Sequence, residues 1–158
     1  MEGKIEENND STIITEIVNK SFITVANEFD YTIKNAPMFP AFIKKDIIEK
    51  QILKGLKMYV YKVGNKIIGS IGYSFKNNKY TIERLSVLPE YRHKNIGKTL
   101  MVIIENKIKE KNGLSVKVEI VNNNIRLKEW YKKLGYKEVE VQEFNHLPFK
   151  VGIMEKEI

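Results

Sequence analysis

The chain has 158 residues, no cysteine and a formal net charge of +7, and its length suits a single domain over residues 1–158. The lack of cysteine excludes disulfides, thiolate metal ligands and a cysteine nucleophile, and two histidines are too few for a histidine-rich metal site, so we expect no metal. No apolar run is long enough to span a membrane and the polar segment 1–10 lacks a signal-peptide core, which indicates a cytoplasmic protein without a membrane partner.

The N-terminal part is expected to form a short strand and two helices. Lys4 to Glu6 is the strand, and Asp10 or Ser11 can cap the first helix because their side-chain oxygens accept its free N–H groups. The apolar residues of this helix recur at helical spacing and are Ile13, Ile14, Ile17, Val18, Phe22 and Val25. Two prolines predict an irregular loop over residues 29–40, and helical spacing then predicts a second helix from Phe42 to Leu56.

Three strands with tight turns between them are predicted next. The period of the apolar residues changes to that of a strand in Lys57 to Val63, Ile67 to Phe75 and Tyr80 to Val87. The pairs Gly64-Asn65 and Asn77-Asn78 favour tight turns between these strands. The segment is therefore expected to be an antiparallel meander.

The C-terminal half alternates between helices and strands. A helix from Asn95 to Lys111 is expected, with a core face of Leu100, Ile103, Ile104 and Ile108. The elements expected after it are a strand from Val116 to Val121, a helix from Asn124 to Leu134, and strands from Tyr136 to Phe144 and from Lys150 to Lys156. The whole order predicts one mixed α/β layered fold.

The strongest chemical signal is the junction from Leu85 to Thr99, where a strand ends, a basic loop follows and a helix begins. A helix N-terminus presents unpaired N–H groups and partial positive charge, so a phosphate can dock there. Arg92, Lys94 and Lys98 add full charges, and Gly97 has no side chain that would keep an anion from the backbone. The alternative is an ordinary strand-to-helix connection with solvated lysines. The segment is not a nucleoside-triphosphate loop, because Arg92 stands where that motif needs its first glycine.

Three blocks follow one another in a recognisable order: Ile82 to Arg92, Arg92 to Gly97, and Asn124 with Trp130 to Tyr136. They resemble the strand and turn, the Arg/Gln-x-x-Gly-x-Gly/Ala pyrophosphate loop, and the Asn…Tyr-x-x-x-Gly-Phe segment of the GNAT superfamily of N-acetyltransferases. The resemblance is specific over about residues 80–136. Asn95 stands where that family usually has glycine, and asparagine is the residue that next best tolerates a positive φ.

The resemblance implies the fold class of that family, which is α/β with a mixed, mostly antiparallel sheet of about six or seven strands flanked by about four helices. It also implies acetyl-CoA as co-substrate. The cofactor-binding residues that it implies are Leu85, Ser86, Val87, Arg92, His93, Lys94, Asn95, Ile96, Gly97, Lys98, Thr99, Asn124 and Tyr131. Backbone groups of Leu85 and Val87 would pair with the pantetheine arm as an added strand does, and the Val87 N–H would polarise the thioester carbonyl.

In this family the acceptor amine attacks the thioester directly, and the resemblance implies Tyr131 as general acid and Glu83 as base. A phenol can hydrogen-bond to a leaving thiolate or protonate it, and a carboxylate in a partly dry cleft can accept a proton. From the residues alone, Tyr131 also fits a core aromatic on an amphipathic helix. Glu83 also fits a surface residue paired with Arg84 or a lysine of a neighbouring strand.

The acceptor side is assigned to residues outside these blocks. Tyr31, Phe39 and Phe42 of the early loop are expected to shape the acceptor site, and His146 to line it or to serve as an alternative base. The other interpretation is that the loop packs on the core and that His146 is solvated. The expected acceptor is a small-molecule or peptide amine.

Charge and composition bear on the remaining classes of partner. The net charge of +7 favours an anionic partner, but the lysines are dispersed and no helix-turn-helix or zinc pattern is present, so we expect no nucleic acid.

The alternative function is a non-catalytic module that senses CoA or an acyl-CoA. Such a module could dispense with Glu83 and Tyr131, and both are present. The protein is expected to be a monomer or homodimer, and its richness in Lys, Ile and Asn is typical of an AT-rich bacterial genome.

Overall fold

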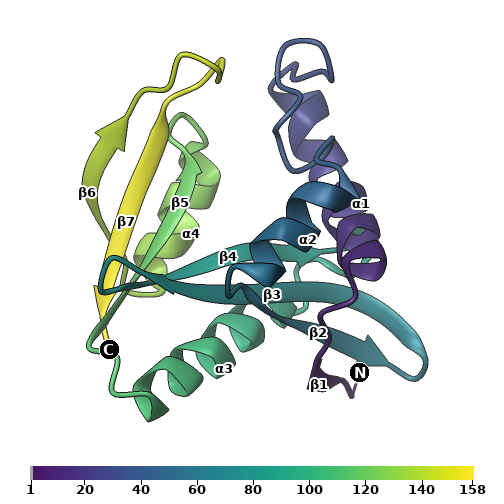
Figure 1. Ribbon diagram of the computed structural model, residues 1–158, viewed down its shortest axis with the longest axis vertical. Helices are drawn as coiled ribbons and strands as arrows, with labels where there is room; N and C mark the ends of the chain where they lie inside the picture. Colours follow the sequence, from purple (N-terminus) through teal and green to yellow (C-terminus); the bar gives the residue numbers. More distant parts are fainter. Residues whose placement is uncertain (1) are drawn as a thin grey trace.

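The computed structural model describes residues 2–158, in which one sheet is covered by helices (Figure 1). The elements in chain order are β1 (Lys4–Glu7), α1 (Ser11–Glu28), α2 (Lys45–Leu53), β2 (Lys57–Val63), β3 (Lys66–Lys76), β4 (Lys79–Val87), a short 3-10 turn η1 (Pro89–Tyr91), α3 (Ile96–Glu110), β5 (Ser115–Val121), α4 (Ile125–Lys133), β6 (Lys137–Gln142) and β7 (Val151–Glu157). None of the helices in residues 2–158 is both long and apolar enough to cross a membrane.

The seven strands form one sheet in the order β1-β2-β3-β4-β5-β7-β6. Of the neighbouring strand pairs in this described part of the chain, only β4 and β5 run parallel. The expectation of a mixed, mostly antiparallel sheet with about four helices is confirmed. The turns of the meander contain Gly64, Asn77 and Asn78, which all have a positive φ.

The two faces of the sheet bury different helices, as Figure 1 shows for α3 on one side and α1 with α2 on the other. Alternation along β2 accounts for this division, because successive side chains of a strand point to opposite faces. Met58 and Val60 pack against α1 and α2. Tyr59 and Tyr61 belong to the core that includes α3.

Three predicted boundaries are wrong by a few residues. Helix α2 spans Lys45–Leu53, so it begins after Phe42 and ends before Leu56. The N–H groups of Phe42 and Ile43 donate to the Phe39 carbonyl in a turn, and Lys44 is extended, so the helical bonds start only after it. Strand β6 ends at Gln142 and does not reach Phe144.

The buried face of α3 also differs from the prediction. Ile103 is only partly buried, whereas Met101 and Glu105 are buried beside Leu100, Ile104 and Ile108. Met101, Glu105 and Ile108 are spaced by four and three residues, so they share one stripe of the helix. A glutamate on such a stripe needs buried partners.

The feature that positions the site is the separation of β4 from β5. The two strands pair only at their starts, where Tyr80 faces Val116 and Thr81 faces Lys117. Beyond these pairs the edge of β4 that faces β5 has no partner strand among the described residues. Figure 1 shows β5, β7 and β6 running steeply away from the nearly horizontal strands β2 to β4.

A β-bulge in β4 accompanies this separation. The register with β3 shifts between Ser70 and Gly72, and Arg84 has φ +58°. The Ser86 hydroxyl donates to the Arg84 carbonyl at 3.1 Å, and the Ser70 hydroxyl approaches the same oxygen at 3.5 Å. The two serines thus hold the bulge where the unpaired edge of β4 begins.

Candidate active site

The loop between η1 and α3 forms a concave row of backbone N–H groups. His93 has φ +64° and Asn95 has φ +63°, whereas Lys94 between them does not have a positive φ, so positive and negative φ values alternate along the loop. Such an alternation turns successive N–H groups toward one point and makes an anion-binding nest. Asn95 fills the glycine position of the resembled loop in the conformation that asparagine tolerates. The positive φ of His93 has no signal in the sequence.

Six consecutive N–H groups, from His93 to Lys98, donate no hydrogen bond to any residue of the described part of the chain. The next one, of Thr99, donates to the Asn95 carbonyl at 3.0 Å and begins the helical ladder. The Asn95 side chain does not cap the helix. The start of α3 therefore presents a row of unpaired donors and the positive end of its dipole to the outside.

Side chains around the nest are divided between core and surface. Ile96 is buried in the main core, so only its N–H group faces the nest. Lys94 and Lys98 are exposed. The Lys94 ammonium lies 5.7 Å from the centre of the Tyr91 ring, and the ammonium of Lys66, the first residue of β3, lies 5.2 Å from the same centre. No sequence motif predicts Lys66 in this place.

The Arg92 side chain is turned away from the nest and joins it to α1. Its Nη1 donates to Thr24 Oγ1 at 2.8 Å, its Nη2 to the Ser21 carbonyl, and its Nε to the Val87 carbonyl at 3.2 Å. All three nitrogens of the guanidinium thus have partners within the protein. The geometry makes Arg92 a clamp between α1 and the end of β4.

Replacing Arg92 by methionine is expected to lower the free energy of unfolding by about 1–3 kcal/mol, because half-buried acceptors such as the Ser21 carbonyl lose their donor. Urea unfolding followed by circular dichroism measures the effect. Lys94→Met is the control and should change the free energy by less than about 0.5 kcal/mol, since Lys94 is exposed. Equal stability of the Arg92→Met protein and the wild type would show that the clamp contributes nothing.

Helix α4 lies against the nest through Trp130. A Cβ atom added to Gly97 would lie 3.4 Å from the Trp130 ring and 4.0 Å from the Val87 side chain. Gly97, the end of β4 and α4 therefore meet at one place. The sequence motifs do not predict this contact between Trp130 and the loop that precedes α3.

Tyr131 follows Trp130 and is buried where α4 packs on the sheet. Its ring makes edge-to-face contacts with the rings of Trp130 and Tyr136, and the distances between ring centres are 5.0 Å and 5.5 Å. Its hydroxyl makes no hydrogen bond to any residue among 2–158, and burial raises the pKa of Tyr131 above its ordinary 10.0. The phenol is thus a protonated donor without a protein partner.

Glu83 lies on β4 just before the bulge and is half-buried. The Ser74 hydroxyl of β3 donates to Glu83 Oε2 at 2.6 Å. Ser74 alternates with Tyr73, which packs toward α3, so Ser74 and Glu83 lie on the face of α1 and α2. The Arg84 guanidinium instead contacts Gln51 of α2 at 3.2 Å, so Glu83 is held by a serine and not by an arginine.

Asn124 is the N-cap of α4. Its Oδ1 accepts from the Leu127 N–H at 3.2 Å, so one end of the amide is occupied within the protein. Lys128 of the same helix donates to Asn122 and pairs with Glu138 at 2.8 Å. These bonds fix the start of α4, and through it the position of Tyr131 relative to β5.

The aromatic residues of the early loop pack together on the α1 side. Tyr31 and Phe39 are buried, Phe42 is half-buried, and all three belong to one cluster that also contains Phe149. The Phe149 ring lies 5.1 Å from Tyr31 and 6.0 Å from Phe39. Residues before β7 therefore contact the loop after α1. His146 is exposed, and its ring neighbour is Phe144 at 5.8 Å.

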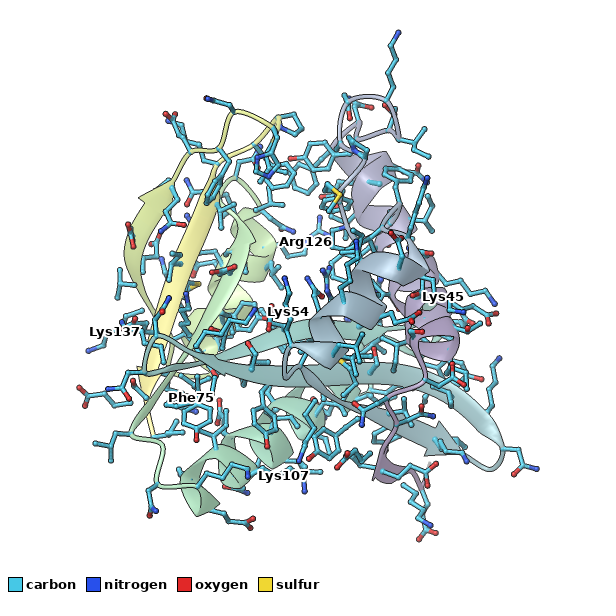
Figure 2. The ribbon with its side chains drawn as sticks, in the orientation of Figure 1. Lys45, Lys54, Phe75, Lys107, Arg126 and Lys137 are labelled. Carbon is cyan, nitrogen blue, oxygen red and sulfur yellow. The ribbon has the colours of Figure 1, made fainter. Side chains whose placement is uncertain are left out.

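An ion pair also joins the C-terminal half of the chain to α1. Arg126 Nη2 at the start of α4 lies 3.2 Å from Glu28 Oε1 at the end of α1, and Figure 2 labels Arg126 between α1 and the strands β5 and β7. Both side chains are well exposed, so the pair adds little stability. It nevertheless shows which ends of α1 and α4 face each other.

The structure thus brings together the nest from His93 to Lys98, the unpaired edge of β4, and α4 with Trp130. It does not bring the Arg92 guanidinium or the His146 ring to this place. Within residues 2–158, no three His, Cys, Asp or Glu side chains are grouped closely enough to hold a metal ion.

Comparisons with known proteins identify relatives of this chain. A family model described as an acetyltransferase (GNAT) domain matches residues 27–158. A spermidine N(1)-acetyltransferase of Thermoplasma acidophilum is 37% identical over 71 residues. This match covers 45% of the present chain and 44% of the relative, which is less than half of that protein's length.

Solved structures share the fold over nearly the whole chain. PaiA N-acetyltransferase from Thermoplasma acidophilum in complex with coenzyme A has a TM-score of 0.73 at 23% identity and covers 100% of both chains. A GNAT family acetyltransferase from Elizabethkingia anophelis with acetyl-CoA bound has a TM-score of 0.68 at 16% identity, covering 99% of this chain and 98% of that one. Since the family model spans most of the sequence, the chain belongs to the acetyltransferase (GNAT) domain family.

Proposed function

We propose that this protein is an acetyl-CoA-dependent N-acetyltransferase that moves the acetyl group to a primary amine by direct attack. The observation that carries the proposal is the row of six unpaired N–H groups from His93 to Lys98. A row of this kind fits a diphosphate, because each oxygen can accept from more than one donor and the helix dipole favours negative charge. Membership of the GNAT family agrees with a diphosphate that belongs to coenzyme A.

The remaining groups of the site suit the other parts of the same ligand. The Leu88 N–H donates to Ile68 of β3, so alternation turns the Val87 N–H toward the unpaired side of β4. An extended pantetheine arm can add to this edge as a strand does, with Leu85 and Val87 as its backbone partners. The Val87 N–H can then polarise the thioester carbonyl.

The proposed chemistry uses Glu83 and Tyr131. An acceptor ammonium gives its proton to the Glu83 carboxylate, directly or through water, and the neutral nitrogen attacks the thioester carbonyl carbon. The carbon–sulfur bond then breaks, the sulfur leaves with the bonding electrons, and the nitrogen loses its second proton to water as the neutral amide forms. The Tyr131 phenol donates a hydrogen bond to this thiolate or protonates it. Its raised pKa keeps the proton in place below pH 10, so ionisation of Tyr131 should not lower kcat in that range.

The acceptor is proposed to be a small primary amine that enters from the α1 and α2 face, where Glu83 lies. The relative from Thermoplasma acidophilum is named for spermidine, and this makes polyamines the first acceptors to test. The aromatic cluster of Tyr31, Phe39 and Phe149 is close to this side and would limit the size of the acceptor.

A thiol-release assay tests the proposal. The protein is mixed with acetyl-CoA and a panel of amines that includes spermidine, amino acids, peptides and aminoglycosides, and free CoA is measured with a thiol reagent. Release that depends on one class of amine, with the acetylated amine found by mass spectrometry, supports the function. Binding of acetyl-CoA without transfer to any amine would instead support a CoA-sensing module.

Glu83→Gln is expected to lower kcat by about 10²–10⁴-fold, because glutamine keeps the size of the side chain but cannot accept the proton. The measurement is steady-state kcat with the best amine of the panel.

The matched control is Glu155→Gln, since Glu155 pairs with Lys79 at 2.8 Å in an exposed position. This variant should keep the wild-type kcat. Retained turnover in Glu83→Gln would remove Glu83 from the mechanism.

A further inference from the structure

A buried polar cluster lies behind Tyr131 and has no part in the chemistry described above. Glu105 of α3 is 6% exposed, and both of its carboxylate oxygens have partners. The Tyr136 hydroxyl donates to Oε2 at 2.6 Å, and the Lys156 ammonium of β7 donates to Oε1 at 3.0 Å. Because burial of an unpaired carboxylate is costly, this pairing makes the charge tolerable in the core.

The cluster is more specific than packing alone requires. A phenylalanine at position 136 would fill almost the same space, and a leucine at 105 would suit the apolar stripe of α3. The hydrogen bond instead fixes the Tyr136 ring in one orientation relative to α3. Burial and the Glu105 carboxylate raise the pKa of Tyr136, so its phenol keeps the proton that it donates.

Tyr136 is in direct contact with Tyr131. The two rings pack edge to face with centres 5.5 Å apart and planes at 70°. The Tyr136 N–H also donates to the Tyr131 carbonyl at 3.1 Å. Tyr131 has no hydrogen bond of its own at the hydroxyl within residues 2–158, so its ring is oriented by Trp130 and Tyr136.

We propose that Glu105 and Tyr136 are positioning residues that orient Tyr131. The carboxylate holds the Tyr136 phenol, the Tyr136 ring holds the Tyr131 ring, and the Tyr131 hydroxyl is thereby aimed at the place where the sulfur leaves. This inference rests on the proposed function, in which Tyr131 meets the thiolate. A small displacement of a reacting group can cost a large factor in rate, so the effect should appear in kcat.

Tyr136→Phe removes one oxygen and keeps the ring. We expect kcat to fall about 10-fold to 100-fold with little change in the KM for acetyl-CoA, because the ring of Tyr131 loses its fixed neighbour. In a Tyr131→Phe background the same change should have no further effect on kcat. Glu105→Gln keeps an acceptor for the Tyr136 hydroxyl, so it should lose less activity than Glu105→Leu. Tyr61→Phe is the control, since Tyr61 is a buried tyrosine on the distant strand β2.

A measurement that needs no activity completes the test. Ring-labelled tyrosine gives NMR signals for Tyr131 that are assigned by their loss in Tyr131→Phe, and these signals should shift in Tyr136→Phe but not in Tyr61→Phe. An equal loss of kcat by Tyr136→Phe in both backgrounds, or an unchanged kcat, would overturn the inference. If the wild type transfers acetyl to no amine, the proposed function fails, and unchanged Tyr131 signals would then reject the positioning role separately.

Discussion

Tyr131→Phe is expected to lower kcat by about 10²–10⁴-fold while the fold and the affinity for coenzyme A stay close to those of the wild type. The change removes one hydroxyl that has no protein partner, so no hydrogen bond within residues 2–158 is lost. The departing thiolate loses its donor in a buried place where water replaces it poorly. Steady-state kinetics with the best amine of the panel measures the effect.

The control for this prediction is stability. A buried tyrosine changed to phenylalanine without loss of a hydrogen bond should alter the unfolding midpoint only slightly. A large fall in kcat with an unchanged midpoint assigns the effect to chemistry. Wild-type turnover in Tyr131→Phe would reject the role of the phenol and leave Tyr131 as a core aromatic.

Gly97→Asp is expected to weaken the binding of coenzyme A by about 100-fold and to leave the protein as stable as the wild type or slightly more so. An aspartate in the first turn of α3, which has no acidic residue, stabilises the helix dipole by about 0.3–1 kcal/mol. A Cβ atom at this position makes only ordinary contact with Trp130, at 3.4 Å. The same carboxylate repels a diphosphate in the nest. Stability and affinity should therefore change in opposite directions.

Gly97→Asn is the matched control, because asparagine has the size of aspartate without its charge. Its affinity for coenzyme A should stay much closer to that of the wild type. Isothermal titration calorimetry gives the affinities and thermal unfolding gives the stabilities. Equal affinities of the Asp and Asn variants would show that no anion is bound next to position 97.

The fold could be predicted from the sequence because its signals are local. The change from helical to strand period at Lys57 and the turn pairs Gly64-Asn65 and Asn77-Asn78 define the meander without any knowledge of distant contacts. The asparagine at the N-cap of α4 is likewise visible as a start signal. Boundaries next to prolines were less predictable, as the late start of α2 shows.

The parts of the site that were not predictable depend on contacts between distant segments. No local sequence pattern predicts the β-bulge at Arg84, because the Arg84 carbonyl accepts hydrogen bonds from the hydroxyls of Ser70 and Ser86. The basic loop was recognised, yet its charged residue Arg92 is bonded to α1, and the nest is formed by backbone N–H groups. Patterns of residue type do not predict the backbone conformation of the loop when a non-glycine residue such as His93 takes a positive φ.

The buried cluster of Glu105, Tyr136 and Lys156 shows a related difficulty. The spacing of Met101 and Glu105 on α3 was present in the sequence, but a glutamate next to an apolar stripe is usually solvated. Its partners come from the turn between α4 and β6 and from β7, and only the tertiary structure brings them to α3.

The central claim is that the N–H groups from His93 to Lys98 bind the diphosphate of coenzyme A. Calorimetric titration of the wild-type protein with coenzyme A and, in parallel, with pantetheine tests it most directly, because pantetheine lacks the diphosphate. The account predicts saturable binding of coenzyme A and binding of pantetheine that is weaker by at least about 100-fold. Equal affinity for the two compounds, or no heat with millimolar coenzyme A, would contradict it.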